Sequence, residues 1–231
     1  MSDLAIIIPV LNEAGSVGIQ LEALSPLRTR GAQIVVVDGG STDGTAARAE
    51  KGADLVVVAP PGRASQMNAG ASIARGETLL FLHVDTMLPP EADFLVETAL
   101  ASSARRWGRF DVRIVPETWP LGMVAMAMNW RSRLTGIATG DQAIFVRSAA
   151  FSAVGGFPDI PLMEDIALSK RLKHLGRPIC LREAVSTSGR RWQKQGVART
   201  IVLMWYLRLA YFFGADPHVL AKRYGYVPTA R

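Results

Sequence analysis

The sequence has one cysteine, Cys180, so no disulfide can form within the chain. A chain without disulfides is typical of a reducing compartment, and we therefore expect a cytoplasmic protein. The first residues carry Asp3 and neither Lys nor Arg, and Pro9 interrupts the apolar run that follows. This pattern is not typical of a signal peptide.

The sequence also lacks an uninterrupted apolar run of about 20 residues, the length that a membrane-spanning helix needs. Its longest late apolar stretch, residues 197–213, contains Arg199 and Arg208. On a helix these two arginines fall on opposite sides, which is not the pattern of a helix lying on a membrane surface. We expect a core helix here, with peripheral membrane contact as the alternative.

No run of Lys and Arg with interleaved aromatic residues is present, so we do not expect nucleic-acid binding. The net charge of +6 is nevertheless unevenly distributed. Residues 1–165 hold 13 Lys and Arg against 18 Asp and Glu, whereas residues 166–231 hold 13 against 2. The basic C-terminal part suits an anionic lipid surface or a phosphorylated substrate, or it forms a solvated face.

What is present is an alternation of buried-strand and helix patterns. Apolar, β-branched runs predict strands at 5–10, 34–38, 55–59, 79–85, 143–146 and 178–181. Helices are predicted at about 13–29, 44–52, 64–75 and 90–105. The alternation predicts an α/β fold with a mostly parallel sheet flanked by helices, in a single domain.

Residues 107–140 show no clear period, and we interpret them as an inserted segment. Met123, Met126 and Met128 in this segment are typical of a core cluster, with an adaptable lining for an apolar substrate as the alternative.

The segment VVVDGGSTDGT at 35–45 ends a predicted strand in Asp38 and continues into a Gly-Gly turn. Asp38 either holds the turn or binds a ribose. A nicotinamide cofactor is not expected, because the turn after the first strand, PVLNEAGSVG, lacks the G-x-G-x-x-G pattern.

In LLFLHVDT at 79–86, an imidazole and a carboxylate follow a buried strand. If the strand continues, His83 and Asp85 point to the same side of the sheet. Ligands in parallel α/β folds bind beyond the carboxyl ends of the strands, which is where both Asp38 and Asp85 are expected.

Two helix starts carry charged residues. Arg63 precedes the helix predicted at 64–75, and a cation at a helix N-terminus suits a phosphate. Glu164 and Asp165 open a helix that is predicted to end at Gly176. Acids in a first turn are accounted for by the helix dipole alone, so this pair by itself does not identify a site.

Taken together, these segments resemble the family 2 glycosyltransferases of the GT-A fold, and among them the small, single-domain members. The resemblance rests on IIPVLNE, VVVDGGSTDGT, LLFLHVDT, GDQAIFVRSAAFSAVGGFP and PLMED, which occur in the order typical of that family. It implies one GT-A domain over residues 1–231, with a nucleotide-binding half at 1–105. The acceptor-binding and catalytic half, at 106–231, then includes the C-terminal helices.

The resemblance also implies roles for individual residues. Asp165 matches the catalytic base, with Glu164 beside it, and Asp141 and Trp192 are expected on the acceptor side. The HVD triplet occupies the position of the metal-binding acids, so Asp85 and His83 are the expected metal ligands. The donor nucleotide-sugar is expected to contact Pro9, Asn12, Glu13, Asp38, Gly40, Arg63, Val84, Asp85 and Arg191.

The chain departs from the family pattern at two positions. His83 stands where an acid is usual, and an imidazole suits Mn²⁺ better than Mg²⁺, so the expected cofactor is a divalent cation, Mn²⁺ or Mg²⁺. Arg190-Arg191-Trp192 resembles the end of the Q-x-x-R-W signature of processive synthases, but Ser188 replaces the glutamine. This favours transfer of a single sugar.

The sequence thus predicts an inverting, metal-assisted transferase with an unidentified acceptor. Two alternatives stay open: a sugar-nucleotidyltransferase and a non-catalytic protein that binds sugar nucleotides. The first usually has a basic Gly-rich loop after strand one, which LNEAGSVG does not provide, and the second has no use for Asp165.

Overall fold

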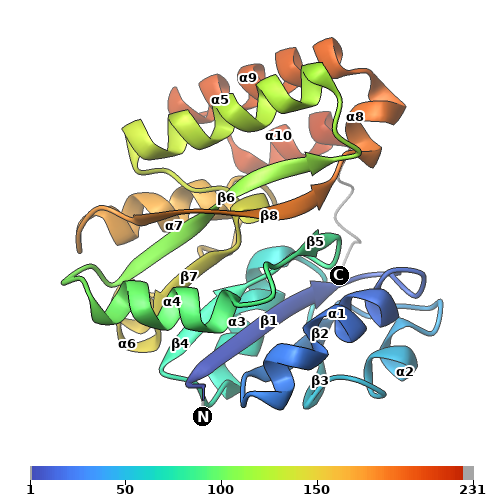
Figure 1. The fold of residues 1–231 in the computed structure, drawn as a ribbon. Helices are drawn as coiled ribbons and strands as arrows, with labels where there is room; N and C mark the ends of the chain where they lie inside the picture. The colour runs from blue at the N-terminus through green and yellow to red at the C-terminus, as the bar shows by residue number, and fades with distance from the viewer. Residues whose placement is uncertain (1, 226–231) are drawn as a thin grey trace.

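The computed structural model of the chain describes residues 2–225, except for the side chains of residues 191, 194 and 195. Its framework is an eight-stranded sheet of order β3-β2-β1-β4-β7-β6-β8-β5, with helices on both faces (Figure 1). Four of the strand pairings are parallel and three are antiparallel. The prediction of a mostly parallel α/β sheet is therefore confirmed.

The N-terminal half of the sheet is built from parallel strands joined by helices. Its elements are β1 (Leu4–Val10), α1 (Val17–Thr29), β2 (Gln33–Asp38), α2 (Thr45–Ala49), β3 (Leu55–Val58), α3 (Arg63–Ile73) and β4 (Thr78–Phe81). Val10 pairs with Asp38 and Asp38 with Val58, so three strands end at one edge of the sheet. The loops that follow these strands gather there.

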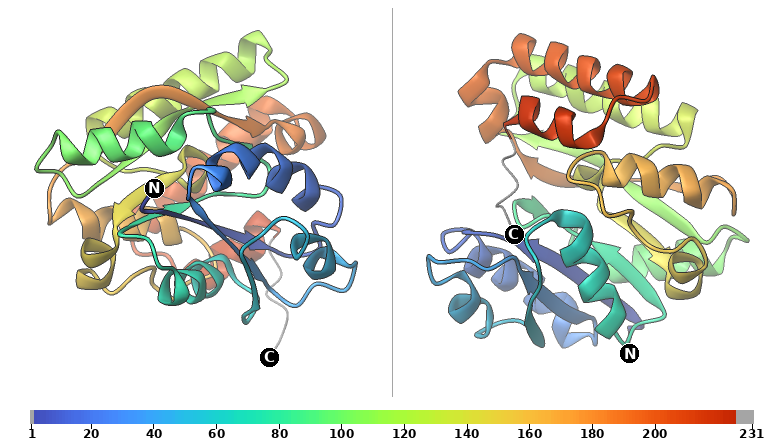
Figure 2. Two further views of the ribbon diagram at one scale, coloured as in Figure 1. Left: turned by 60° about the horizontal axis from the view of Figure 1, so that its bottom comes forward. Right: turned by 180° about the vertical axis from the view of Figure 1, so that it is seen from behind.

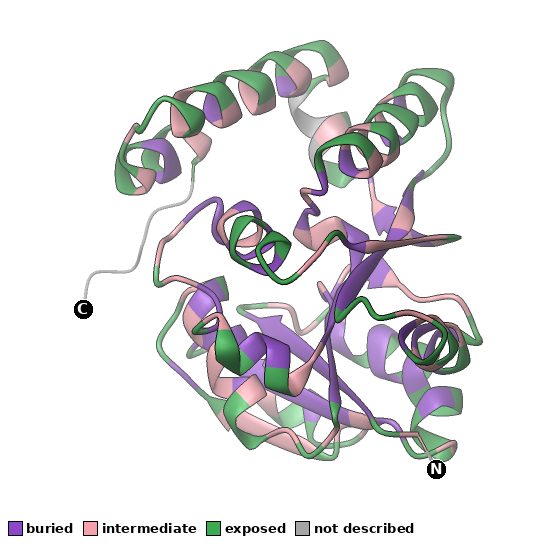
Figure 3. Cartoon of the chain, turned by 90° about the vertical axis from the view of Figure 1, so that its left-hand side faces the viewer, coloured by how far each residue is buried: buried purple, intermediate pink, exposed green. Residues whose placement is uncertain are grey.

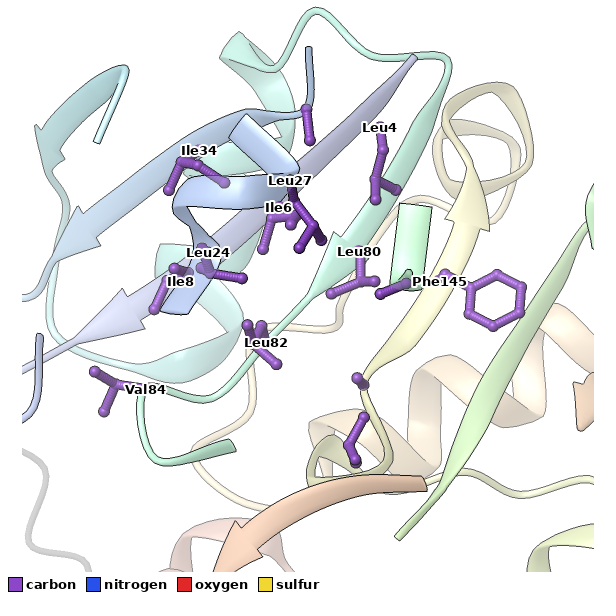
Figure 4. Close-up of a cluster of buried hydrophobic side chains, with 14 of the residues drawn as sticks. Leu4, Ile6, Ile8, Leu24, Leu27, Ile34, Leu80, Leu82, Val84 and Phe145 are labelled. Carbon is purple, nitrogen blue, oxygen red and sulfur yellow. The ribbon is translucent and has the colours of Figure 1, made fainter. Parts of the chain in front are cut away.

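The core is divided into two layers by the pleat of the sheet. Alternate residues of β1 face opposite sides: Leu4, Ile6 and Ile8 pack toward Leu24 and Leu27 of α1, as Figure 4 shows. Ala5 and Ile7 pack on the other face, in a cluster with residues of α3, α6 and α7. Because both faces are covered, β1 is apolar at almost every position.

The C-terminal half adds antiparallel pairings. Strand β7 runs antiparallel to β4 and β6 antiparallel to β7, while β6 and β8 are parallel. Its elements are β5 (Thr86–Met87), α4 (Ala92–Ala101), β6 (Trp107–Val115), α5 (Trp119–Thr135), the short 3-10 helix η1 (Gly140–Gln142), β7 (Ile144–Arg147), α6 (Ser148–Ala153), α7 (Glu164–Lys173) and β8 (Ile179–Ser188).

Three further helices close the C-terminal end: α8 (Arg190–Gln195), α9 (Val197–Phe212) and α10 (Pro217–Tyr224). Helices α9 and α10 lie at the same end of the molecule as α5, beyond α7 (Figure 2, right). Leu207 of α9 is fully buried in a cluster with Met163 and Ile166, at the start of α7. Helix α9 therefore packs beside the segment that carries Glu164 and Asp165.

Three predictions about the elements were wrong. Strand β4 ends at Phe81, so the HVD triplet lies in the turn before β5 rather than in a strand. Residues 107–140 are not an irregular insert but hold the nine-residue strand β6 and the seventeen-residue helix α5. Met123 and Met126 are about half exposed and do not belong to the core, whereas Met128 packs against it as predicted.

Helix α9 is not the core helix that we predicted. Only Thr200 and Leu207 in it are buried, and the side of the helix that faces away from the sheet is exposed (Figure 3). Among the described residues, no helix combines the length and the hydropathy needed to cross a bilayer.

Candidate active site

A pocket of about 260 Å³ opens where β1 and β4 end. It is lined by nine residues: Pro9, Val10, Leu11, Glu13, Arg63, Gln66, His83, Val84 and Asp85. Six of these, all but Val10, Leu11 and Gln66, are among the residues predicted to bind the donor or the metal. The pocket lies beyond the carboxyl ends of parallel strands, which is where α/β folds bind ligands.

The HVD turn places its three side chains in different surroundings. The carbonyl of His83 accepts a hydrogen bond from the N–H of Thr86 at 3.0 Å, which closes the turn. Val84 is buried in the core cluster below α1, where it fixes the turn to the sheet (Figure 4). The carboxylate of Asp85 lines the pocket and makes no hydrogen bond or ion pair with the described residues.

His83 faces the segment around η1. Its Nδ1 lies 3.3 Å from Oδ1 of Asp141, and a Cβ on Gly140 would lie 2.4 Å from its Nε2. Burial opposes ionisation of Asp141, but the hydrogen bond and charge of His83, with Arg63 and Arg208, outweigh it and lower the pKa of this carboxyl. Both ring nitrogens thus lie against Gly140 and Asp141, which leaves Asp85 better placed than His83 to bind a cation.

Arg63 is the first residue of α3 and reaches from the pocket toward α7. Its Nη1 lies 4.0 Å from Oε1 of Glu164, and its side chain is 49% exposed. The Glu164 carboxyl is buried, and this burial, together with the charge of Asp165, raises its pKa to about 7, although Arg63 acts in the opposite direction. Glu164 therefore titrates near neutral pH.

Asp165 is held by two backbone groups. Oδ2 accepts a hydrogen bond from the N–H of Gly140 at 2.9 Å, and Oδ1 accepts one from Ile166 at 2.7 Å. The N–H of Gly140 thus ties Asp165 to the segment that also contacts His83. Neither Glu164 nor Asp165 lines the pocket itself. Glu164 is linked to the pocket through Arg63, and Asp165 through Gly140.

Within residues 2–225, three residues other than glycine have a positive φ, and all three adjoin these segments. They are Asn12 (φ 54°) after β1, Ala143 (φ 45°) after η1 and Met163 (φ 69°) directly before Glu164. Such backbone conformations cost about 1–3 kcal/mol each and are concentrated at functional sites.

Asp38 uses its carboxylate in the turn after β2. Oδ2 accepts hydrogen bonds from the N–H groups of Gly40 at 3.1 Å and Ser41 at 2.8 Å, and Oδ1 accepts one from the Ser41 hydroxyl. Asn12 joins this turn to the loop after β1 by accepting a hydrogen bond from the N–H of Thr42 at 2.9 Å. Asp38 thus holds the turn, and its contact with a donor stays a prediction.

The predicted residues of α8 lie in a different environment. Trp192 is partly buried against Ile114, Leu121 and Ala125, between β6 and α5. The side chain of Arg191 lies outside the described part of the structure. No described contact joins Trp192 to the pocket.

Some residues of the site were missed at the level of sequence. Gln66 is buried in the pocket wall, where its Nε2 donates hydrogen bonds to the carbonyls of Val10 at 2.8 Å and Val37 at 2.7 Å. No pattern distinguishes this glutamine from others on a helix. Gly140 directly precedes the predicted Asp141, and this was the one signal in the sequence that could have pointed to it. The structure adds that a side chain at this position has no room beside His83.

A larger groove of about 630 Å³ lies between β6 and α5 and is lined by residues from Asp111 to Arg133. It contains none of the predicted site residues. Glu164, Asp165 and the smaller pocket therefore remain the candidate active site.

A pocket with an arginine and carboxylates beyond the strand ends of an α/β sheet suits a phosphorylated ligand. The profile described as glycosyl transferase family 2 matches residues 5–150 of the chain. The chain therefore belongs to glycosyltransferase family 2.

Solved structures similar to the chain share its fold. Residues 1–349 of TarS from S. aureus superpose with a TM-score of 0.65 at 19% identity, over 82% of this chain and 61% of that one. For the mannosyltransferase PcManGT from Pyrobaculum calidifontis, in complex with GDP-Man and Mn²⁺, the TM-score is 0.62 at 20% identity, over 80% and 56% of the two chains.

Glucosyl-3-phosphoglycerate synthase from Mycobacterium tuberculosis, in complex with Mn²⁺, UDP and phosphoglyceric acid, gives a TM-score of 0.65 at 17% identity. The match covers 93% of this chain and 80% of that one. At these identities the similarity establishes the GT-A fold. No curated protein sequence matches the chain.

Proposed function

We propose that the chain is an inverting glycosyltransferase, which moves one sugar from a nucleoside-diphosphate sugar to an acceptor hydroxyl. The observation that carries this proposal is the pocket itself. It combines the carboxylate of Asp85, which no described residue pairs with, and the half-exposed cation Arg63. Arg63 connects the pocket to the carboxylate pair at the start of α7.

Arg63 and the first turn of α3 suit the donor diphosphate. A guanidinium recognises phosphate oxygens, and the free N–H groups of a helix N-terminus favour the same negative charge. Glu13 and Pro9 line the part of the pocket formed by β1 and the loop after it. We assign the nucleoside to that part, with the turn around Asp38 and Gly40 at its edge and Arg191 as a further donor contact.

The residues present fit a divalent cation at Asp85. Its carboxylate has no partner among the described residues, and Mg²⁺ and Mn²⁺ need few protein ligands when diphosphate oxygens and waters complete their shell. Such an ion would offset the negative charge that builds up on the leaving diphosphate. The two structures that contain Mn²⁺ support this assignment. Whether His83 also reaches the ion stays a prediction.

The proposed chemistry is a single displacement. Asp165 accepts the proton of the acceptor hydroxyl while that oxygen bonds to the anomeric carbon of the sugar. The bond from that carbon to the diphosphate oxygen breaks on the opposite face, so the configuration inverts. The hydrogen bonds from Gly140 and Ile166 orient the carboxylate for this role. Asp141 and Trp192 are proposed on the acceptor side, and Ser188 favours one transfer per acceptor.

A panel of sugar nucleotides with Mn²⁺ or Mg²⁺ tests the proposal. Binding followed by release of a nucleoside diphosphate supports a transferase. Formation of a sugar nucleotide from a nucleoside triphosphate and a sugar phosphate would instead identify a nucleotidyltransferase. Binding of a sugar nucleotide without turnover, across a broad set of acceptors, would identify a non-catalytic binding protein.

We also propose that the enzyme is cytoplasmic and contacts an anionic membrane surface through α5 and α9. Each helix exposes large apolar residues at helical spacing on one side: Trp119, Met123, Met126, Trp130 and Leu134 on α5, and Val202, Trp205, Tyr206, Leu209, Phe212 and Phe213 on or directly after α9. Such aromatic residues favour the membrane interface, and the C-terminal part of the chain is strongly basic.

Sedimentation with phosphatidylglycerol vesicles tests this contact. The wild-type protein should sediment with the vesicles, Trp205→Glu should do so less, and Ile19→Glu, which changes an exposed residue of α1, should behave as wild type. Self-association without vesicle binding would assign the apolar surface to a second copy of the chain instead.

A further inference from the structure

Arg131, in the last part of α5, is a cation that the described residues leave without partners. Its Nε and Nη2 atoms are buried and make no hydrogen bond with the described part of the chain. A buried polar group without a hydrogen bond costs roughly 1–3 kcal/mol, and more if it is charged. Buried groups of this kind in a folded protein call for a ligand or another explanation.

Arg131 lies close enough to Asp165, the predicted base, for their charges to interact. Burial, followed by the nearby charges of Arg208 and Arg109, lowers the pKa of Arg131 to about 10, and Asp165 acts in the opposite direction. Arg109 is already engaged, since its Nη2 donates to the carbonyl of Asn129 at 3.1 Å and Nη1 pairs with Asp111. Arg208, in contrast, forms no hydrogen bond or ion pair through its side chain with the described residues.

Arg208 is a half-buried residue of α9, the helix that packs against the start of α7. Its neighbour Leu207 is fully buried against the residues that precede and open α7, and Tyr211 lies one turn further along. The charge of Arg208 also lowers the pKa of Asp141. Arg131 on α5 and Arg208 on α9 therefore lie close enough to Asp165 and Asp141, respectively, for their charges to interact.

We infer that Arg131 and Arg208 bind an anionic group of the acceptor, a phosphate or a carboxylate. This inference rests on the proposed function, because it takes Asp165 as the base that receives the acceptor. The planar guanidinium matches the oxygens of phosphate and carboxylate, and an anion between two guanidinium groups removes their mutual repulsion. An acceptor without such a group would leave Nε and Nη2 of Arg131 without a hydrogen-bond acceptor among the described residues.

Calorimetry with inorganic phosphate tests the site directly. The donor pocket is first saturated with Mn²⁺ and a nucleoside diphosphate, or disabled by Arg63→Gln if no nucleoside diphosphate binds. Wild-type protein should bind phosphate, and Arg131→Gln and Arg208→Gln should each bind it roughly tenfold more weakly or worse. Arg199→Gln removes the same charge from an exposed position of α9 and should change nothing.

Thermal unfolding separates this role from a structural one. Because Arg131 has two buried unpartnered nitrogens, Arg131→Gln should keep or raise the melting temperature without phosphate, and phosphate should stabilise only the wild type. Equal phosphate affinity in the wild type and the three variants would overturn the inference. A lower melting temperature in Arg131→Gln alone, without phosphate, would overturn it as well. Neither readout requires sugar transfer, so the inference can fail while the proposed function holds, and the reverse.

The source of the anion is separated by two further probes. Glycerol 3-phosphate presents a soluble phosphate monoester, and phosphatidic acid in vesicles presents the same group on a lipid. Binding of the first that depends on Arg131 indicates a soluble acceptor, whereas Arg131-dependent binding of the second alone indicates a lipid-borne one. If neither compound binds, the acceptor group is not a phosphate, and a carboxylate remains, for which glycerate is the matching probe. If glycerate does not bind either, the inference is overturned.

Discussion

Nδ1 of His83 lies 3.3 Å from Oδ1 of Asp141, so the turn after β4 is fastened to η1. Gly140, the residue before Asp141, donates its N–H to Asp165 at 2.9 Å. The wall of the proposed donor pocket and the proposed base are therefore joined through one short segment. A change in this segment should affect both.

Gly140→Ala tests this connection. The added Cβ would lie 2.4 Å from Nε2 of His83, so the ring must rotate away and lose its contact with Asp141. We expect a loss of about 1–3 kcal/mol in unfolding free energy, as for other overpacked sites, and weaker donor binding. Thermal unfolding and calorimetry with a nucleoside diphosphate measure the two effects.

Gly122→Ala is the matched control for Gly140→Ala. Gly122 lies in α5, and nothing stands within 4 Å of the position of an added Cβ. Alanine in a helix should stabilise the protein by roughly 0.5–1 kcal/mol and leave donor binding unchanged. Wild-type stability and donor affinity in Gly140→Ala would contradict the proposed coupling.

Asp85→Ala tests the metal assignment. Because the Asp85 carboxylate has no other partner among the described residues, it should serve the cation alone, and its loss should remove the dependence of nucleoside-diphosphate binding on divalent metal. In the wild type, Mn²⁺ should support binding at least as well as Mg²⁺. Titrations with Mn²⁺ and with EDTA measure this, with the exposed Glu22→Ala on α1 as control. Equal wild-type affinity under both conditions would refute the assignment.

Glu164→Gln should change how stability depends on pH. Burial raises the pKa of Glu164 from 4.5 to about 7, so the folded state keeps this proton at pH values where the unfolded chain has lost it. Wild-type stability should therefore fall as the pH rises from about 4.5 to about 7. A neutral glutamine avoids this loss, which amounts to at most about 3 kcal/mol above pH 7.

Melting temperatures of Glu164→Gln and wild type between pH 5 and pH 8 check this prediction. The melting temperature of Glu164→Gln should rise relative to that of the wild type as the pH increases. The melting temperature of Glu183→Gln, which changes an exposed residue of β8, should not. A difference that stays constant with pH would show that Glu164 does not titrate near neutrality.

The N-terminal half of the fold could be predicted from the sequence because its strands are covered on both faces. Such strands are apolar throughout, as in Ala5 to Val10, and they are separated by recognisable helices. Strand β6 was missed because its apolar residues are separated by Arg109, Asp111 and Arg113, so that it contains no long apolar run. The amphipathic signal of α5 was missed for a related reason: its apolar residues Trp119, Met123 and Trp130 are exposed.

The candidate site was predicted in part for the same physical reasons. Strand ends can be read from the sequence, so the neighbourhood of Arg63 and Asp85 was foreseen. Contacts that depend on the packing of the C-terminal half could not be foreseen. The burial of Glu164, the hydrogen bond from Gly140 to Asp165 and the isolated charge of Arg131 all require the relative positions of α5, α7 and α9.

The most direct test of the proposed function is the turnover of Asp165→Asn. Asparagine cannot accept the proton of the acceptor, and general-base assistance is typically worth about 10²–10⁴-fold in rate. Asparagine keeps one acceptor oxygen for the two N–H groups that Asp165 now binds, so stability should fall by only about 1 kcal/mol, and donor affinity should stay near that of the wild type. Glu164→Gln, which changes the neighbouring carboxyl, is the control and should retain far more turnover. With a donor identified from the sugar-nucleotide panel, we predict that Asp165→Asn loses at least about 99% of its turnover; retention of more than about a tenth would contradict the assignment of Asp165 as the base.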